Sequence, residues 1–371
     1  MVENNSLSAE RIAEKRSKYG KDPAIMESMI HALYLLEQLK ITGLDFIFKG
    51  GTSLVLLMPQ AKRFSVDIDI IVSPTITRET LERYLSNISE TSAFLRVELD
   101  EKRSYKEGIP KAHYKFIYNS NFSNRNNEGS IVTNPEREIL LDVIFAENHY
   151  PTLVDRPIET EWLIQSDEHV FVTTPDINSI TGDKLAAFAP NTTGIPYHVE
   201  KEKEIIKQLF DVGCLFELLT DLEIFKQSFT ECAKVEIAYR PERKIKSVQH
   251  VLRDTFDTAL LIAKKDVLTN EEDKANFKEI KTGIDQFGHF VYIEKFGIIE
   301  AQVASAKAAY LAAIVLTDYK GDLQKFSTVV PLSDYLITNI EYNFLNKRLK
   351  FVAKGEALFY WSQAIRLLYP E

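Results

Sequence analysis

The sequence predicts an α+β protein, with a mixed sheet in its N-terminal half and helices in its C-terminal half. Before about residue 200, short runs rich in β-branched and aromatic residues alternate with amphipathic runs at helical spacing. After that point, amphipathic helical runs follow one another with only short polar breaks. The 371 residues are enough for two cores. We therefore predict one domain over residues 1–200 and a helical domain over 201–371.

The N-terminal half begins with an amphipathic helix and continues as strands and short helices. The breaks fall at Gly50-Gly51, Pro59 and Ser73-Pro74, which are residues that end helices or form turns. The predicted helices are 24–40, 52–58, 78–89 and one that starts at Pro175. The predicted strands are 45–49, 66–72, 94–100, 112–118, 138–145 and 169–174.

The C-terminal half contains six predicted helices. Each has apolar residues repeating at helical spacing. They span 200–219, 221–239, 247–264, 298–318, 331–346 and 355–368.

Composition excludes several classes of protein. The formal charge of −9 argues against a surface that is basic throughout, but not against a local basic patch. Cys214 and Cys232 have no metal-ligand spacing. The first twenty residues lack the apolar core of a signal peptide, and AAYLAAIVL (308–316) is too short to span a bilayer. We expect a cytoplasmic protein without a membrane partner.

Two aspartates lie inside the predicted strand VDIDIIV (66–72). Asp67 and Asp69 project from the same side of a strand, because successive side chains alternate. Adjacent carboxylates repel one another unless a cation lies between them. Mg²⁺, or Mn²⁺ in its place, prefers such oxygen ligands and leaves positions open for phosphate oxygens.

The turn that precedes these aspartates suits a phosphate group. In KGGTSL (49–54), Gly50 and Gly51 allow the backbone to come close to a ligand. The following helix directs its first amides at an anion, and Thr52 and Ser53 add hydroxyl donors. An acidic pair or a glycine pair alone is a weak signal. Their order in one segment predicts a site for a metal-bound nucleoside triphosphate (NTP).

KGGTSL followed by RFSVDIDI resembles the AbiEii/AbiGii toxin family of bacterial nucleotidyltransferases, within the DNA polymerase β-like superfamily. The resemblance is closest over residues 45–72 and extends to about residue 215. It implies a polymerase β-like palm with a mixed sheet, an NTP substrate, and a toxin that is paired with a cognate antitoxin. Related toxins modify the acceptor ends of tRNA, so an RNA acceptor is implied too.

The resemblance also implies further site residues. A third carboxylate on a neighbouring strand corresponds to Asp142, which could instead be an edge-strand residue facing solvent. The family's D-K-L motif corresponds to Lys184, and its D-hydrophobic-x-x-L helix to Asp211. Lys184 would hold phosphates, and Asp211 would orient the nucleotide, the acceptor or Lys184. Both could otherwise be ordinary helix-surface residues.

Other cations could complete the site. The triphosphate could also be bound by Lys49, directly before the glycine turn, and by Arg63 and Ser65, just before the aspartates. The segment YRPERKIKS (239–247) is strongly basic, and is either a solvated loop or a contact to RNA. Its cations are Arg240, Arg243, Lys244 and Lys246.

We expect a Mg²⁺-dependent nucleotidyltransferase. Asp67, Asp69, Lys184 and Asp211 would be its catalytic residues, with Asp142 as an additional metal ligand. Two alternatives stay open on sequence grounds. One is a transferase that modifies a protein hydroxyl or a small molecule, and the other is a non-catalytic protein that binds nucleotides or RNA.

Overall fold

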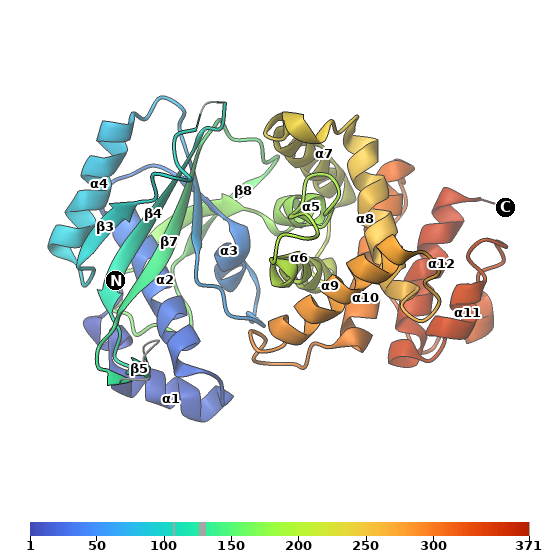
Figure 1. Cartoon of the computed structure of the whole chain (residues 1–371), viewed down its shortest axis with the longest axis horizontal. Coiled ribbons are helices and arrows are strands. Elements are labelled where there is room, and N and C mark those ends of the chain that lie inside the picture. The colour runs from blue at the N-terminus through green and yellow to red at the C-terminus, as the bar shows by residue number, and fades with distance from the viewer. Residues whose placement is uncertain (107, 126–130, 371) are drawn as a thin grey trace. The chain divides into compact units, whose positions relative to one another are not determined.

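A computed structural model describes residues 1–106, 108–125 and 131–370 (Figure 1). The chain forms two compact units. The first contains Met1–Asn148 and Leu153–Asp176, and the second contains His149–Thr152 and the chain from Ile177 onward. The second unit thus includes a helix that precedes residue 200. The functional division at residue 200 stays a prediction.

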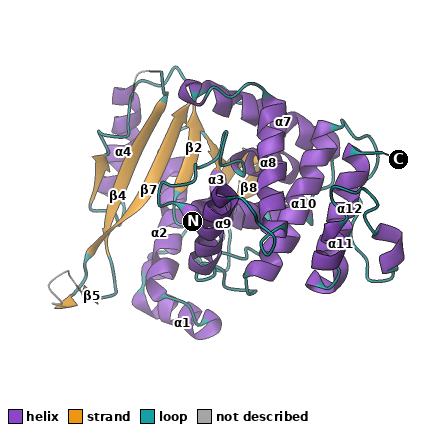
Figure 2. Cartoon of the chain, turned by 45° about the vertical axis from the view of Figure 1, so that its right-hand side comes forward, coloured by secondary structure: helices purple, strands orange, loops and turns teal. Residues whose placement is uncertain are grey.

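The first unit is built on a seven-stranded mixed sheet, shown in orange in Figure 2. The pairs β2–β7 and β1–β9 are parallel, and the other neighbours in this sheet are antiparallel. Its strands lie in the order β3 (Arg96–Leu99), β4 (Lys111–Asn119), β7 (Glu136–Phe145), β2 (Ile68–Val72), β1 (Ile47–Lys49), β9 (Phe171–Pro175) and β8 (Leu153–Pro157). A separate pair joins β5 (Asn124–Arg125) and β6 (Ile131–Val132).

Helix α2 (Pro23–Ile41) packs on one face of this sheet, together with α4 (Arg78–Thr91). Alternate residues of β4 and β7 face these helices and are fully buried, as the period of two in a strand requires. His31 of α2 stacks on Tyr118 of β4 with ring centroids 3.8 Å apart. The opposite face is therefore free to carry polar side chains.

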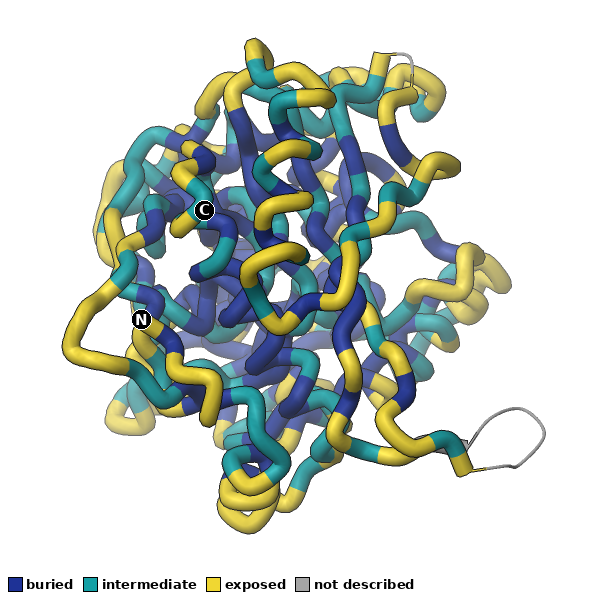
Figure 3. Tube along the Cα trace, turned by 90° about the vertical axis from the view of Figure 1, so that its left-hand side faces the viewer, coloured by how far each residue is buried: buried dark blue, intermediate teal, exposed yellow. Residues whose placement is uncertain are grey.

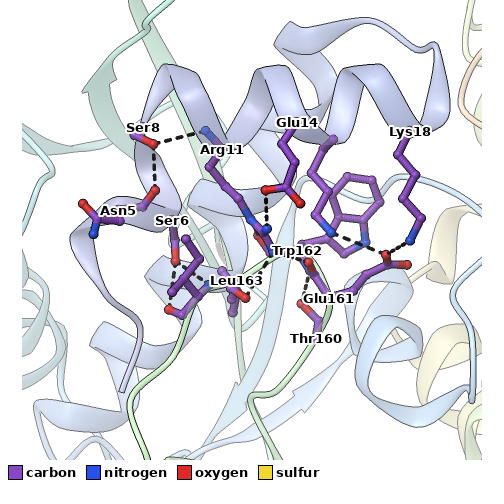
Figure 4. Close-up of polar contacts among 12 residues, drawn as sticks. Asn5, Ser6, Ser8, Arg11, Glu14, Lys18, Thr160, Glu161, Trp162 and Leu163 are labelled. Atoms are coloured by element: carbon purple, nitrogen blue, oxygen red, sulfur yellow. Dashed lines mark hydrogen bonds and ion pairs between the residues drawn. The ribbon is translucent and has the colours of Figure 1, made fainter.

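Helix α1 (Ala9–Tyr19) follows a short 3₁₀ turn, η1 (Asn4–Leu7), and closes over the loop that precedes β9. Arg11 donates hydrogen bonds to three carbonyl groups of that loop (Figure 4). Glu161 accepts from Lys15 and Lys18, and Trp162 stacks on the ring of Tyr19. Neither α1 nor β8 is among the sequence predictions, because α1 is mostly polar and β8 is only five residues long.

The second unit is helical. Its helices are α5 (Ile177–Ala187), α6 (Glu202–Phe216), α7 (Leu222–Ala238), α8 (Val248–Ala263), α9 (Glu271–Phe287), α10 (Ile298–Leu316), α11 (Phe344–Leu349) and α12 (Glu356–Leu368), with 3₁₀ turns η2 (Pro241–Arg243), η3 (Leu332–Tyr335) and η4 (Val352–Gly355). Helix α10 is central and contacts α6, α8, α9 and α12. It is long and apolar enough to cross a membrane, but 78% of its most apolar window is buried inside the protein, as in a core helix. Figure 3 shows burial along the whole trace.

One predicted helix is wrong. Residues 331–346 form η3, an extended stretch, a turn over 340–343 and only the first three residues of α11. Tyr335 and Ile337 are buried, whereas Leu336 and Thr338 are exposed, so the period is two and not 3.6. The side chain of Asn346 pairs with both backbone groups of Ile337, which satisfies this extended backbone. Helix α9 was not predicted, because its short apolar stripe follows an acidic first turn.

Candidate active site

The glycine turn joins β1 directly to helix α3 (Gly50–Leu57) in the first unit. Gly50 has a φ of +77°, which favours glycine. A Cβ atom at this position would lie 2.0 Å from Oδ2 of Asp69. The backbone of the turn therefore packs against the carboxylate of Asp69, and only glycine leaves room for it.

The strand register places four polar side chains in one row across the sheet. Lys49 on β1 is opposite Asp69 on β2, and Asp69 is paired with Asp142 on β7. Asp142 is in turn opposite His113 on β4. Residues paired in this way project from the same face, with neighbouring strands about 5 Å apart. We call Lys49, Asp69, Asp142 and His113 the polar row.

Asp67 lies just before β2, and the alternation predicted for this segment is confirmed. Ile68 and Ile70 are fully buried, whereas Asp67 and Asp69 are half-buried. The Thr52 hydroxyl donates a hydrogen bond to the backbone carbonyl of Asp67 (2.5 Å). Helix α3 thereby fixes the start of the strand that carries both aspartates.

Arg63, Ser65 and the hydroxyls of α3 form the buried support of the turn. The Thr52 and Ser65 hydroxyls are 2.9 Å apart, and Ser53 donates to the Gly50 carbonyl (2.9 Å). A Cβ atom on Gly51 would lie 2.4 Å from Nη2 of Arg63. Each of these side chains is at most 5% exposed. Contacts from these side chains to a nucleotide stay a prediction.

Asp142 is held by two basic side chains. Its Oδ1 lies 2.5 Å from Nδ1 of His113, and its Oδ2 lies 3.9 Å from Nη2 of Arg103. His113 and Arg103 were not predicted as site residues. His113 can be recognised as part of the site only from the strand register, which places it opposite Asp142.

Lys184 of α5 and Asp211 of α6 form an ion pair within the second unit. Nζ of Lys184 lies 3.0 Å from Oδ2 of Asp211 and donates to Gln208 (3.3 Å). The Lys184 and Asp211 side chains are only 6% and 1% exposed. They are therefore not solvated helix-surface residues, and their catalytic roles stay a prediction.

Residues 34–294 match the sequence model of a protein family, which is described as the nucleotidyl transferase AbiEii toxin of type IV toxin–antitoxin systems. The chain belongs to the AbiEii family. It is accordingly a nucleotidyltransferase that uses an NTP, and a toxin of the type IV class. This excludes the non-catalytic alternative. A comparison with curated proteins gave no match.

Carboxylate oxygens such as those of Asp67 and Asp69 are the ligands that a hard divalent cation prefers, and a cation at this position stays a prediction. In the chain that the structure describes, no three histidine, cysteine or acidic side chains are grouped as a metal site. Asp67 and Asp69 would thus supply two oxygen ligands and leave the other positions to phosphate oxygens and water, as Mg²⁺ prefers. A direct role for Asp142 as a third ligand stays a prediction.

The basic segment 239–247 is partly used inside the second unit. Arg243 donates hydrogen bonds to the carbonyls of Thr192 (2.5 Å) and Gly194 (2.9 Å), and its burial lowers its pKa. Arg240 pairs with Glu236. Lys244 and Lys246 are exposed. Charge reversal at Arg243 would thus disturb a loop, and only the two lysines are well suited to contact RNA.

Proposed function

We propose that this AbiEii toxin transfers a nucleotide from an NTP to an RNA acceptor, the exposed end of a tRNA, in a Mg²⁺-dependent reaction in the cytoplasm. The observation that carries the proposal is the close packing of the Gly50 turn against Asp69, inside the polar row. This packing supports the proposal, because a turn suited to phosphate oxygens and a carboxylate suited to a cation lie in contact.

Each residue of the first unit would have a distinct task. Asp67 and Asp69 would hold the cation, which would neutralise phosphate charge and activate the acceptor oxygen. The Gly50-Gly51 backbone and the first amides of α3 would receive phosphate oxygens. Lys49, at the end of the polar row, would add a positive charge beside them.

The reaction forms one bond and breaks another. The acceptor hydroxyl gives its proton to solvent water, and its oxygen attacks the α-phosphorus of the NTP. The bond from the α-phosphorus to the bridging oxygen breaks, and pyrophosphate leaves. Because the protein does little covalent chemistry in phosphoryl transfer, positioning and charge stabilisation would supply most of the rate.

Transfer to a protein hydroxyl or to a small molecule is the competing function. Exposed cations in the second unit, such as Lys244 and Lys246, favour a polyanionic acceptor. The family assignment favours a cognate antitoxin as the protein partner, and leaves the acceptor unspecified.

The acceptor can be identified directly. Purified protein is incubated with each of the four α-labelled NTPs and Mg²⁺, together with either total RNA or a protein extract. We expect the label on RNA of tRNA size, and its loss when Mg²⁺ is chelated. Label on protein alone would support the competing function.

A further inference from the structure

Residues 347–354 (KRLKFVAK) are more basic than segment 239–247. They contain Lys347, Arg348, Lys350 and Lys354 and no acidic residue. Within the described chain, none of these four side chains makes an ion pair or a side-chain hydrogen bond. The segment lies beyond residue 294, where the family match ends.

The packing of α11 presents these cations to solvent. Leu345 and Leu349 are fully buried and hold the helix to the core of the second unit. Lys347 and Arg348 project from its other side and are exposed, as is Lys354 beyond the helix. Figure 1 shows α11 and α12 in red.

A large aromatic ring stands among the cations. Phe351 is 82% exposed, and Nζ of Lys350 lies 4.8 Å from its ring centroid. Nζ of Lys264, which directly follows α8, lies 5.9 Å from the ring centroid of Phe344, at the start of α11. A single exposed apolar residue is common on protein surfaces, and Val329 and Ile340 are as exposed as Phe351. The position of the Phe351 ring among cations is what suits a ligand with both aromatic and anionic groups.

The backbone after Phe351 is held in a strained conformation. Ala353 (φ 47°) and Lys354 (φ 59°) are both left-handed, and Gly355 (φ 94°) follows them. Residues other than glycine adopt such angles only where the surrounding structure enforces them. A Cβ atom on Gly355 would lie 2.7 Å from the Tyr335 hydroxyl, which shows how closely the turn is packed. The turn thus fixes Lys354 near the end of the segment.

We propose that residues 347–354 form a binding surface for single-stranded RNA, in which a base stacks on Phe351 and the cations contact backbone phosphates. Charge complementarity selects a polyanion. Stacking on an exposed ring is the usual way in which proteins bind unpaired bases. Lys350 and Phe351 are close enough to serve one nucleotide. The proposal rests on the proposed RNA acceptor, and adds where that RNA is held.

Two variants of the full-length protein test the surface, with labelled tRNA as the probe in fluorescence anisotropy. For Lys347→Glu/Arg348→Glu we expect RNA binding about tenfold weaker or more, with a smaller dependence on salt, because two phosphate contacts are lost. For Phe351→Ala we expect binding weaker by about five- to 100-fold at an unchanged salt dependence. NTP affinity should stay the same in both.

Matched controls carry the same changes elsewhere. Lys278→Glu/Lys281→Glu reverses two exposed lysines of α9, and Val329→Ala trims an apolar residue that is 87% exposed. Both controls should bind RNA within about twofold of wild type, because distant exposed charges are screened. Urea unfolding verifies that every variant is folded.

The outcomes separate this inference from the proposed function. If the wild type labels RNA but both surface variants bind RNA like their controls, the surface is wrong and the RNA acceptor stands. If the variants lose the cognate antitoxin and keep RNA binding, the surface belongs to the antitoxin and the inference is also overturned. If the wild type labels only protein, the RNA acceptor itself fails, and this inference fails with it.

Discussion

At the residue scale, the proposed catalytic role of Lys184 and Asp211 has to be separated from their effect on stability. The ion pair is almost completely buried, at 3.0 Å. Breaking a buried ion pair by removing one partner is strongly destabilising, whereas replacing both partners by apolar residues is often neutral. A loss of activity in a single variant would therefore not separate the two roles.

The first prediction uses this asymmetry. Lys184→Ala should lower the free energy of unfolding by about 3–5 kcal/mol. It should also reduce kcat/KM for transfer by about 10²-fold or more, because a positive charge that stabilises the transition state is lost. In Lys184→Met/Asp211→Leu, we expect urea unfolding to return close to wild type while transfer stays low. Wild-type transfer in the double variant would show that the pair is only structural.

The second prediction concerns His31, which is buried in α2 and stacked on Tyr118. Burial lowers the pKa of His31 to about 4 from its ordinary 6.5. The unfolded chain thus binds a proton at a higher pH than the folded chain does. The free energy of unfolding therefore includes the full contribution of neutral His31 above pH 6.5, and this contribution is lost as the pH falls from 6.5 towards 4.

Urea unfolding at pH 7 and pH 5 measures this effect. The wild type should lose roughly 2 kcal/mol through this group between the two pH values. His31→Phe keeps a ring in the stack and cannot titrate. Between the two pH values, its free energy of unfolding should therefore fall by roughly 2 kcal/mol less than that of the wild type. An equal pH dependence in the two proteins would show that His31 is not buried as a neutral group.

At the scale of elements, the turn between β1 and α3 gives the third prediction. Gly50→Ala introduces a methyl group at φ +77°, against the carboxylate of Asp69. We expect transfer to fall by about 10²-fold or more, because small displacements of reacting groups are costly. The free energy of unfolding should fall by more than the roughly 1 kcal/mol of an ordinary left-handed glycine.

Gly43→Ala is the matched control. Gly43 has a φ of +85°, and nothing lies within 4 Å of a Cβ atom built there. This variant should lose about 1 kcal/mol of stability and keep wild-type transfer. If Gly50→Ala behaves like Gly43→Ala in both measurements, the turn does not support the site.

The sequence predicted elements well where one periodicity was strong. Asp67 and Asp69 were placed on one side of a strand, since they alternate with Val66, Ile68 and Ile70. The row that connects Asp69 to Asp142 and His113 depends on strand register, which no local pattern in the three strands encodes. Residues 331–346 misled the prediction because their spacing of apolar residues fits two periods, and only packing decided between them.

At the scale of the whole molecule, the chain has a net charge of −9 and still contains two short basic segments, 239–247 and 347–354. The spacing of apolar residues along the chain correctly predicted an α+β fold with a helical second half. It could not show that the second unit begins at Ile177, because α5 belongs there through its packing on α6 and α7. The sequence also could not show which of the two basic segments is better suited to bind RNA. Arg240 and Arg243 are already used in contacts within the protein, and only the fold creates these contacts.

The central claim is that Asp67 and Asp69 carry out nucleotide transfer, and the rate of transfer by Asp69→Asn tests it most directly. Asparagine keeps the shape of the side chain and removes a negative charge beside Asp67, so the variant should fold with stability equal to or above that of the wild type. Without this charge, the cation would lose a ligand, and the developing negative charge on the phosphate would lose the cation that neutralises it. We predict that label transfer from α-labelled NTP falls at least about 10²-fold, with unfolding by urea unchanged or shifted to higher urea. Transfer at a near-wild-type rate by folded Asp69→Asn would contradict the account.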